Sequence, residues 1–263
     1  MSERLAGRSA VITGGGLGIG RGIAEAYVQA GANVLIAELN EEAGAKAATE
    51  LREQYGANVE FVRTDVADRQ QVQDMIATAV EHFGRLDVLV NNAWGGIPYA
   101  RLEKTPEGSV RAGFEVGAMA AFWGMQAAFP ELSKHGTGRV INIASLNGVN
   151  AHMYSVAYNM AKEALRTLTR TAAREWAEHQ ICCNIICPGA KSDAYNRMAA
   201  ASPENAARMD AANPMGRLGD PLDDIGPVAV FLGGDDCRYL TGNTLFVDGG
   251  SHINGVQWAP NVD

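Results

Sequence analysis

The sequence has few cysteines, no run of basic residues and no long apolar stretch. Its four cysteines, at 182, 183, 187 and 237, show no CxxC spacing and no nearby histidine, so we expect free buried thiols and no metal site. Acidic residues outnumber basic ones by 30 to 22, giving a formal net charge of -8. This charge disfavours nucleic acid and anionic membranes as partners and leaves a small molecule as the expected one.

The absence of a long apolar run also argues against a membrane span. The longest nearly uncharged stretch, 116–130, contains glycine and glutamine and falls short of the ~20 apolar residues that a span requires. Residues 1–7 are polar and lack the pattern of a secretory signal, so we expect a cytoplasmic protein. A chain of 263 residues, 47% of them hydrophobic, suits one domain with one large core.

Short aliphatic runs alternate with longer amphipathic segments, a pattern typical of βα units that form a parallel sheet. We expect strands at 9–13, 33–38, 59–63, 88–91, 139–144, 181–187 and 244–247. The spacing of apolar residues predicts helices over 18–29, 41–55, 70–83, 116–129 and 156–178. The predicted fold is therefore α/β, with a single Rossmann-type doubly wound domain over 1–263.

Two segments carry further expectations. Residues 115–129 are apolar around almost the whole helix, so another subunit is expected to help cover them. Residues 190–217, which contain Pro203 and Pro214, lack strand character and follow a strand's carboxyl end. Because ligands bind at that edge of a parallel sheet, we predict a mobile helical lid that contacts substrate.

A glycine cluster directly follows the first predicted strand, from Thr13 to Gly20 (TGGGLGIG). Residues without a Cβ let the pyrophosphate of a dinucleotide approach the N–H groups at a helix N-terminus. Such a cluster is also compatible with a flexible turn. The strand before it, the helix after it and the acidic end of the second strand favour a dinucleotide site.

Glu38 ends the second predicted strand, 18 residues beyond Gly20. This spacing is close to the ~20 residues expected for the carboxylate that binds the adenosine ribose. A 2′-phosphate would be repelled by Glu38, and Gly16, Leu39 and Asn40 offer no cation to receive it, so we predict NAD as the cofactor. A solvated acid at a strand end is the alternative interpretation.

Tyr158 and Lys162 stand one helical turn apart and therefore share a helix face. A cation at ~4 Å contributes ~4 kcal/mol at an effective dielectric constant of 20, which would lower the pKa of a phenol by about three units. This effect would make Tyr158 a usable general base. Ser145 follows the strand predicted at 139–144, where its hydroxyl can hold a carbonyl or alkoxide oxygen. A Tyr-x-x-x-Lys pair alone is weak evidence, and its value depends on the accompanying motifs.

Those motifs are ordered along the chain. Besides the glycine cluster and Ser145, thirteen residues before Tyr158, they are Asp65-Val66, Asn91-Asn92-Ala93, Pro188-Gly189 and Val247-Asp248-Gly249-Gly250. Together they resemble the short-chain dehydrogenase/reductase family over residues 7–250.

The resemblance implies a seven-stranded sheet and hydride transfer between a secondary alcohol or ketone and nicotinamide C4. It implies Tyr158 as the acid/base, Lys162 on the nicotinamide ribose and Ser145 on the substrate. It also implies a homo-oligomer, a dimer or tetramer, built on helices 116–129 and 156–178. The cofactor-binding positions that it implies are Gly14, Gly16, Leu17, Gly18, Ile19, Gly20, Glu38, Asp65, Val66, Asn92, Ala93, Tyr158, Lys162, Pro188 and Gly189.

The chain departs from the family pattern in three places. Trp94 stands where a glycine usually follows Asn-Asn-Ala, and Gly117 stands where an Asn usually completes a catalytic tetrad and supports a proton-relay water. After Pro188-Gly189, the segment Lys191-Ser192-Asp193 replaces the usual aliphatic residue and Thr beside the nicotinamide amide. A specialised pocket and neutral change on a working scaffold are both compatible with these departures.

Several large or polar residues are expected around the reacting carbon and suggest a partly aromatic or cyclic substrate, although a core or lid contact is equally compatible with each. They are Trp94, Asn147, His152, Tyr154, Tyr195 and Met198. The tail after Gly250, with Trp258 and Pro260, is expected to pack across a subunit boundary.

Two other functions remain open. A 3-oxoacyl-type carbonyl reductase would use the same residues and prefer NADPH. A catalytically weak nucleotide-binding scaffold or sensor would bind cofactor without oxidising an alcohol. A dehalogenase-like relative is disfavoured by the intact glycine cluster and by Lys162.

Overall fold

The computed structural model describes residues 3–253 and contains one parallel sheet in the order β3-β2-β1-β4-β5-β6-β7. The strands are β1 Ser9–Thr13, β2 Asn33–Glu38, β3 Val59–Arg63, β4 Val88–Asn91, β5 Arg139–Ile143, β6 Cys182–Pro188 and β7 Thr244–Val247. The strand order reverses between β1 and β4, which is the topological switch point of a doubly wound fold. The predicted α/β class and seven-stranded parallel sheet are therefore confirmed.

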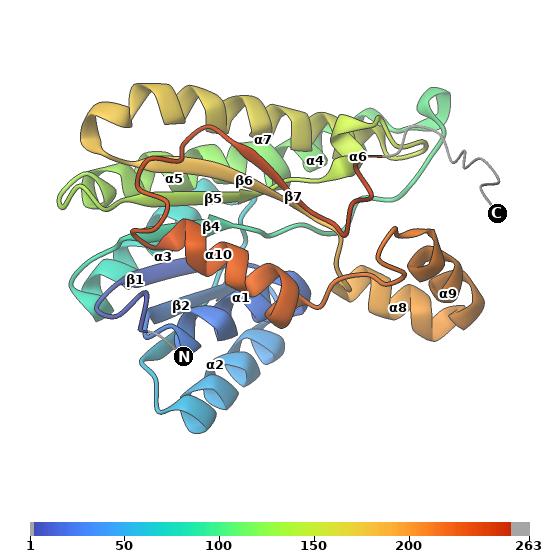
Figure 1. The fold of residues 1–263 in the computed structure, drawn as a ribbon. Helices are drawn as coiled ribbons and strands as arrows, with labels where there is room; N and C mark the ends of the chain where they lie inside the picture. Colours follow the sequence, from blue (N-terminus) through green and yellow to red (C-terminus); the bar gives the residue numbers. More distant parts are fainter. Residues whose placement is uncertain (1–2, 254–263) are drawn as a thin grey trace, which may run out of the picture.

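Helices cover both faces of the sheet (Figure 1). They are α1 Gly18–Gln29, α2 Glu41–Tyr55, α3 Arg69–Phe83, α4 Glu107–Phe114, α5 Ala120–Leu132, α6 Leu146–Val149, α7 Val156–Glu175, α8 Asp193–Ala201, α9 Pro203–Ala212 and α10 Gly226–Gly233. One core cluster joins α1, α2 and α10 to the sheet, and a second joins α3, α5 and α7 to the opposite face. Since both faces are covered, β1, β4 and β5 are buried along their whole length.

The structure matches the predicted elements closely and adds several. Strand β5 ends one residue earlier than predicted, β6 is shifted by one residue at both ends, and α7 ends three residues before the predicted position 178. The helix predicted over 116–129 begins as a π-helix, Glu115–Met119, and continues as α5 to Leu132. Helices α4, α6 and α10 were not predicted from the sequence; all three are short and contain glycine. Among residues 3–253, no helix combines the length and apolar character needed to cross a bilayer.

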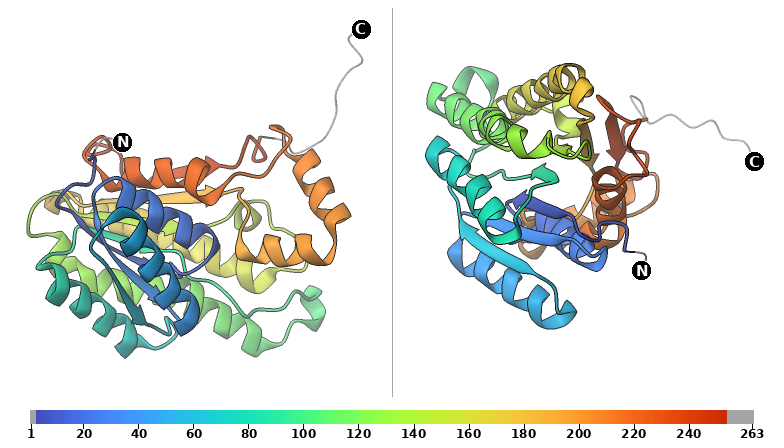
Figure 2. Two further views of the ribbon diagram at one scale, coloured as in Figure 1. Left: turned by 90° about the horizontal axis from the view of Figure 1, so that it is seen from below. Right: turned by 90° about the vertical axis from the view of Figure 1, so that its left-hand side faces the viewer.

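Helices α8 and α9 lie in the segment predicted to be a substrate lid, which is called the lid below; its mobility and its contact with substrate stay predictions. Figure 2 shows both helices beyond one end of the sheet, the end where α6 also lies. A parallel bridge between Ala190 and Gly219 closes the base of the lid, and Lys191 N–H donates to Gly219 O at 2.9 Å. The lid therefore leaves and rejoins the sheet at one point. Trp258 and Pro260 of the tail lie outside the described residues.

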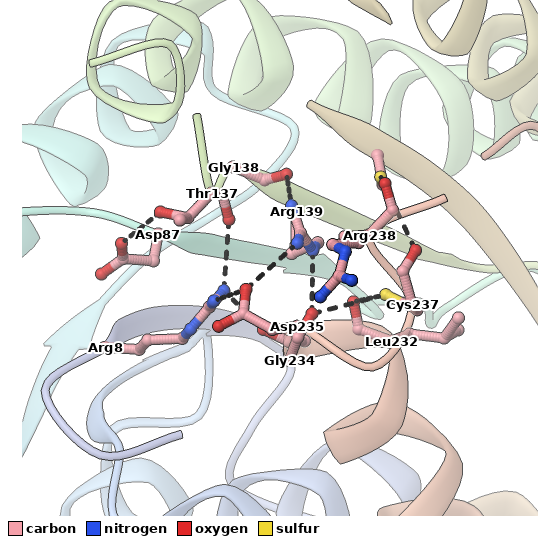
Figure 3. Close-up of polar contacts among 12 residues, drawn as sticks. Arg8, Asp87, Thr137, Gly138, Arg139, Leu232, Gly234, Asp235, Cys237 and Arg238 are labelled. Carbon is pink, nitrogen blue, oxygen red and sulfur yellow. Dashed lines mark hydrogen bonds and ion pairs between the residues drawn. The ribbon is translucent and has the colours of Figure 1, made fainter. Parts of the chain in front are cut away.

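Two buried arginines tie the opposite end of the sheet together (Figure 3). Arg8 and Arg139 both approach Oδ1 of Asp235, at 2.5 and 3.5 Å. Arg8 also donates to the carbonyls of Thr137 and Gly233, and Arg139 donates to those of Gly138 and Gly234. This cluster joins β1, β5 and the segment after α10 at the edge remote from the glycine loop.

Candidate active site

The glycine loop is fastened to β4 by Thr13 and Asn92. Oγ1 of Thr13 accepts from the N–H groups of Asn92 and Ala93 at 2.9 and 3.1 Å, and Nδ2 of Asn92 donates to the carbonyls of Thr13 and Gly14. Gly14 has φ of 63°, a conformation that favours glycine. A Cβ at Gly20 would collide with the carbonyl of Gly14. The loop therefore lies at the switch point between β1 and β4, with its backbone drawn close to the start of α1.

Glu38 reaches from the end of β2 to this loop. Its Oε2 accepts from Gly16 N–H at 3.2 Å and its Oε1 accepts from Asn40 N–H at 3.1 Å. A Cβ at Gly16 would lie 2.9 Å from Cγ of Glu38, so the glycine lets the carboxylate approach the loop. The acid is thus held beside the glycine loop by backbone donors, and its binding of the adenosine ribose stays a prediction.

The other expected cofactor positions line the same edge. Val66 is buried after β3, and Asp65 caps the following turn by accepting from Ala67 N–H at 3.0 Å. Gly189 packs on Asp248, because a Cβ there would lie 2.8 Å from Cα of Asp248. Gly18 packs on the lid in the same way, because a Cβ at Gly18 would lie 2.9 Å from Asp193 N. The glycine loop, the β6 end and the lid therefore meet at one place.

Ser145, Tyr158 and Lys162 come together at the ends of β5 and α7. Ser145 caps α6 and accepts from Asn147 N–H at 3.1 Å, and its side chain also hydrogen-bonds Tyr158. Lys162 is buried and its Nζ donates to Ile143 O at 2.8 Å, so the lysine is anchored to the last residue of β5. Nζ lies 5.6 Å from the centroid of the Tyr158 ring. The three residues that the sequence motif predicted to act together thus form one cluster in the structure.

The acidities of this cluster differ from the expectation. Burial raises the pKa of Tyr158 to about 12, and the hydrogen bond from Ser145 counters this only in part. Burial also lowers the pKa of Lys162 to about 8. The expected lowering of the phenol pKa by Lys162 is therefore wrong for the chain by itself. Loss of water on burial is the largest cause of both shifts.

The three departures from the family pattern all lie in or beside this site. The Trp94 and Tyr158 rings meet edge to face, with centroids 4.7 Å apart. Gly117 lies against Trp94. Asp193 begins helix α8 and pairs with Arg197 of the same helix.

The predicted substrate residues divide into two groups. Asn147 and His152 lie close to Ser145, because His152 N–H donates to Asn147 O at 2.9 Å and Asn147 N–H donates to Ser145. The Tyr195 hydroxyl lies 3.2 Å from Oδ2 of Asp210, so this side chain joins α8 to α9. Met198 also lies on α8, whereas Tyr154 lies in the loop before α7 and has a positive φ of 69°.

Two residues of the site were not singled out from the sequence. Thr13 supplies the hydroxyl that holds the β4 loop, and Tyr99 lies near enough to Tyr158 to raise the pKa of that phenol. Thr13 belonged to the recognised glycine motif, so its position was a usable signal. Tyr99 lies in an irregular segment whose path depends on the contact of Ala100 N–H with Tyr154 O, and no local pattern predicts that contact.

No group of three or more His, Cys, Asp or Glu side chains that could hold a metal occurs within residues 3–253. All four cysteines are buried free thiols.

The chain is similar to known proteins over almost its whole length. A family model described as "Enoyl-(Acyl carrier protein) reductase" matches residues 15–252. The 12alpha-hydroxysteroid dehydrogenase of Clostridium sp. is 38% identical over 250 residues, covering 93% of this chain and 96% of that protein. The 2,5-dichloro-2,5-cyclohexadiene-1,4-diol dehydrogenase LinX of Sphingobium indicum is also 38% identical over 250 residues, covering 95% and 98%.

Among solved structures, the Pseudomonas aeruginosa RhlG/NADP active-site complex aligns with a TM-score of 0.87 and 35% identity, over 95% of this chain and 98% of that one. The fold and the residues at its switch point define a dinucleotide-binding oxidoreductase. More narrowly, the chain belongs to the short-chain dehydrogenase/reductase family, as its motifs predicted.

Proposed function

We propose that the protein oxidises a secondary alcohol to a ketone, or runs the reverse reaction, with NAD(H) and with Tyr158 as the general acid/base. The observation that carries this proposal is the cluster of Ser145, Tyr158 and buried Lys162 at the sheet edge where the glycine loop lies. These groups suit proton transfer at a carbinol oxygen beside a nicotinamide.

Each residue has a distinct task in this reaction. The Ser145 hydroxyl holds the substrate oxygen near Tyr158, and the phenolate of Tyr158 accepts the hydroxyl proton. Lys162 binds the nicotinamide ribose through N–H groups not used by Ile143 O. Oxidised nicotinamide, when bound, supplies the acceptor for the carbinol hydride and a positive charge that favours the phenolate. The proton and the hydride together account for the two hydrogens lost by the alcohol.

NAD is the proposed cofactor because of Glu38. The carboxylate is fixed by two backbone N–H groups beside Gly16, where it can accept from the ribose hydroxyls and repel a 2′-phosphate. The NADP complex named among the similar structures makes this a proposal to be tested on this chain.

The substrate class that the site favours is a bulky alicyclic alcohol. Two segments, 99–102 and 153–154, are referred to as arms and border the catalytic residues. A hydrogen bond joins them, because Ala100 N–H donates to Tyr154 O at 2.8 Å. These arms expose large apolar side chains, namely Tyr99, Leu102, Met153 and Tyr154. An apolar border suits a substrate with little polar surface. The names of the hydroxysteroid and cyclohexadiene-diol dehydrogenases support the same class.

We also propose a homo-oligomer that uses the faces of α5 and α7. A groove of about 410 Å³ lies between these helices and is lined by Phe122, Phe129, Leu168 and Trp176. Phe122 is 37% exposed, although the helix is apolar on almost every side. A second copy would cover this surface, as the sequence predicted, and sedimentation would give the size of the assembly.

A carbonyl reductase acting on acyl substrates is the second candidate, and the description of the matching family model favours it. The experiment that separates the candidates is a screen of the purified protein with NAD and NADP against steroid, cyclic, sugar and aryl-propanol alcohols, with 3-oxoacyl and enoyl thioesters tested against the reduced cofactors. We expect NADH formation with cyclic alcohols.

Tyr158→Phe provides the matched test of mechanism, because it removes one oxygen and leaves the ring in contact with Trp94. The rate should fall by about 10²–10⁴-fold, the usual contribution of general acid–base catalysis, while NAD binding measured by calorimetry stays nearly unchanged. Thioester reduction with NADPH alone would favour the second candidate. NAD binding without turnover of any compound would favour a nucleotide-binding scaffold or sensor.

A further inference from the structure

Two departures from the family pattern meet in space. Gly117 lies in the π-helix Glu115–Met119, and Trp94 lies in the loop after β4. A Cβ at Gly117 would lie 2.8 Å from Cζ3 of Trp94 and 2.9 Å from Cβ of Ala161. Both distances are shorter than Cβ atoms tolerate, so the indole and Ala161 together leave no room for a side chain at position 117. The two departures are therefore in direct contact in the folded chain.

The same indole contacts both members of the Tyr158–Lys162 pair. It meets the phenol ring nearly at right angles, with an interplanar angle of 78°, and Nζ of Lys162 lies 5.4 Å from the indole centroid. An ammonium over an aromatic face is attracted by the ring quadrupole, and edge-to-face ring pairs are favourable. Trp94 is thus placed to hold the ammonium and the phenol in one arrangement.

Little water has access to Lys162 from this side. A cavity lies beside Gly117 and Lys162 and is also bordered by Thr13 and Asn91. The volume that the centre of a water molecule can occupy in it is only ≈ 10 Å³. That is about the space for one water molecule. Apart from Ile143 O, no hydrogen-bond acceptor for Nζ occurs in the part of the chain that the structure describes. An aromatic face therefore matters more here than it would on a solvated lysine.

We infer that Trp94 is a positioning residue of the active site, whose indole fills the space left open by Gly117 and holds Lys162 and Tyr158 together for proton transfer. The inference rests on the proposed function for its consequence in catalysis, but its physical content concerns the chain alone. Trp94 acts through its two neighbours and takes no proton itself.

The direct test is the titration of Lys162 in two variants. Trp94→Leu keeps an apolar side chain and removes the aromatic face, whereas Trp94→Phe keeps a face. The other titratable groups that influence the Tyr158–Lys162 pair, Tyr99 and Cys187, are the same in both. The chain has only five lysines, so ¹⁵N-lysine NMR of the cofactor-free protein can assign the Nζ signal by its loss in Lys162→Met.

Trp94→Leu should lower the pH at which Lys162 loses its proton by about 0.5–1 unit, because the face that favours the ammonium is gone. Trp94→Phe should stay within about 0.3 unit of the unchanged protein, since Phe retains most of the quadrupole. In turnover, Trp94→Leu should reduce kcat about tenfold, while KM for NAD stays within about threefold of that of the unchanged protein. The alkaline limb of the pH profile of kcat should move to lower pH in this variant. A Lys162 titration that is the same in all three proteins would overturn the inference, whether or not the protein oxidises any alcohol.

A second measurement tests the packing between positions 94 and 117. Gly117→Ala should lower Tm in the unchanged protein and lower it less in Trp94→Leu, because one of the two collisions is then absent. Gly108→Ala on α4 is the matched control, since a Cβ there meets no atom within 4 Å and its effect should be the same in both backgrounds. Equal losses for Gly117→Ala in both backgrounds would show that the two positions are not coupled and would contradict the inference.

Discussion

Replacing Glu38 by Ser is expected to move cofactor preference from NAD toward NADP. The carboxylate lies within 3.2 Å of Gly16 N, at the end of β2 where the adenosine ribose is proposed to bind. Serine removes the negative charge and the acceptor for the ribose hydroxyls. NAD should therefore bind more weakly, while NADP escapes repulsion by the acid.

The size of the change follows from the charges. A carboxylate and one phosphate charge about 5 Å apart repel by about 3 kcal/mol at an effective dielectric constant of 20. Glu38 is partly exposed, so solvent and salt reduce this to about 1.5–3 kcal/mol, or about 10- to 100-fold in affinity. The lost contacts to the ribose add about tenfold against NAD. The NAD:NADP ratio of kcat/KM should fall by about 10²- to 10³-fold.

The assay is kcat/KM for each cofactor with one alcohol, at fixed ionic strength, together with calorimetric binding of both cofactors. Glu38→Gln separates charge from shape, because it keeps the size of the side chain. Glu41→Gln, an exposed acid in the first turn of α2, is the matched control and should leave the ratio unchanged. An unchanged ratio in Glu38→Ser, or a wild-type preference for NADP, would refute the reasoning.

Two stability predictions follow. Lys162→Met should abolish activity yet raise Tm at pH 7, because the depressed lysine pKa, about 8, means that the folded state carries a cost of about 3 kcal/mol. This gain should be full below pH 8 and shrink as pH rises toward 10.5; a constant gain in thermal scans would contradict the assignment. Asp235→Asn should lower the free energy of unfolding by about 1–3 kcal/mol, because Arg8 and Arg139 lose a shared carboxylate. The loss is limited because Asp235 is itself 67% exposed, and kcat should stay unchanged. An unchanged free energy of unfolding in urea would contradict this prediction and would show that the backbone carbonyls alone satisfy both arginines.

The sheet was predictable from sequence because its strands are local signals. The aliphatic runs at β1 and β4 are buried on both faces, so they appear as continuous apolar segments and not as an alternation. Glycines fixed the start of α1, since Gly20 must lie against the carbonyl of Gly14. The order of the strands in the sheet was not predicted, because no local pattern in the sequence carries it.

The departures from prediction have different physical origins. The π-helical turn at Glu115–Met119 arises where Gly117 packs under Trp94, a contact between segments distant in sequence. The acidity of Tyr158 was misjudged because a charge–charge argument from helix spacing omits desolvation, which depends on the burial of the whole site. The pairing of Tyr195 with Asp210 is equally a property of the folded lid.

The central claim is that Tyr158 takes the hydroxyl proton while the carbinol hydrogen passes to the nicotinamide. The most direct measurement is single-turnover oxidation of a cyclic alcohol deuterated at the carbinol carbon, with NAD, followed by mass analysis of the nucleotide. The account predicts deuterium in NADH, a primary isotope effect on the chemical step, and loss of that step in Tyr158→Phe despite normal NAD binding. Deuterium transfer at an undiminished rate in Tyr158→Phe would contradict it.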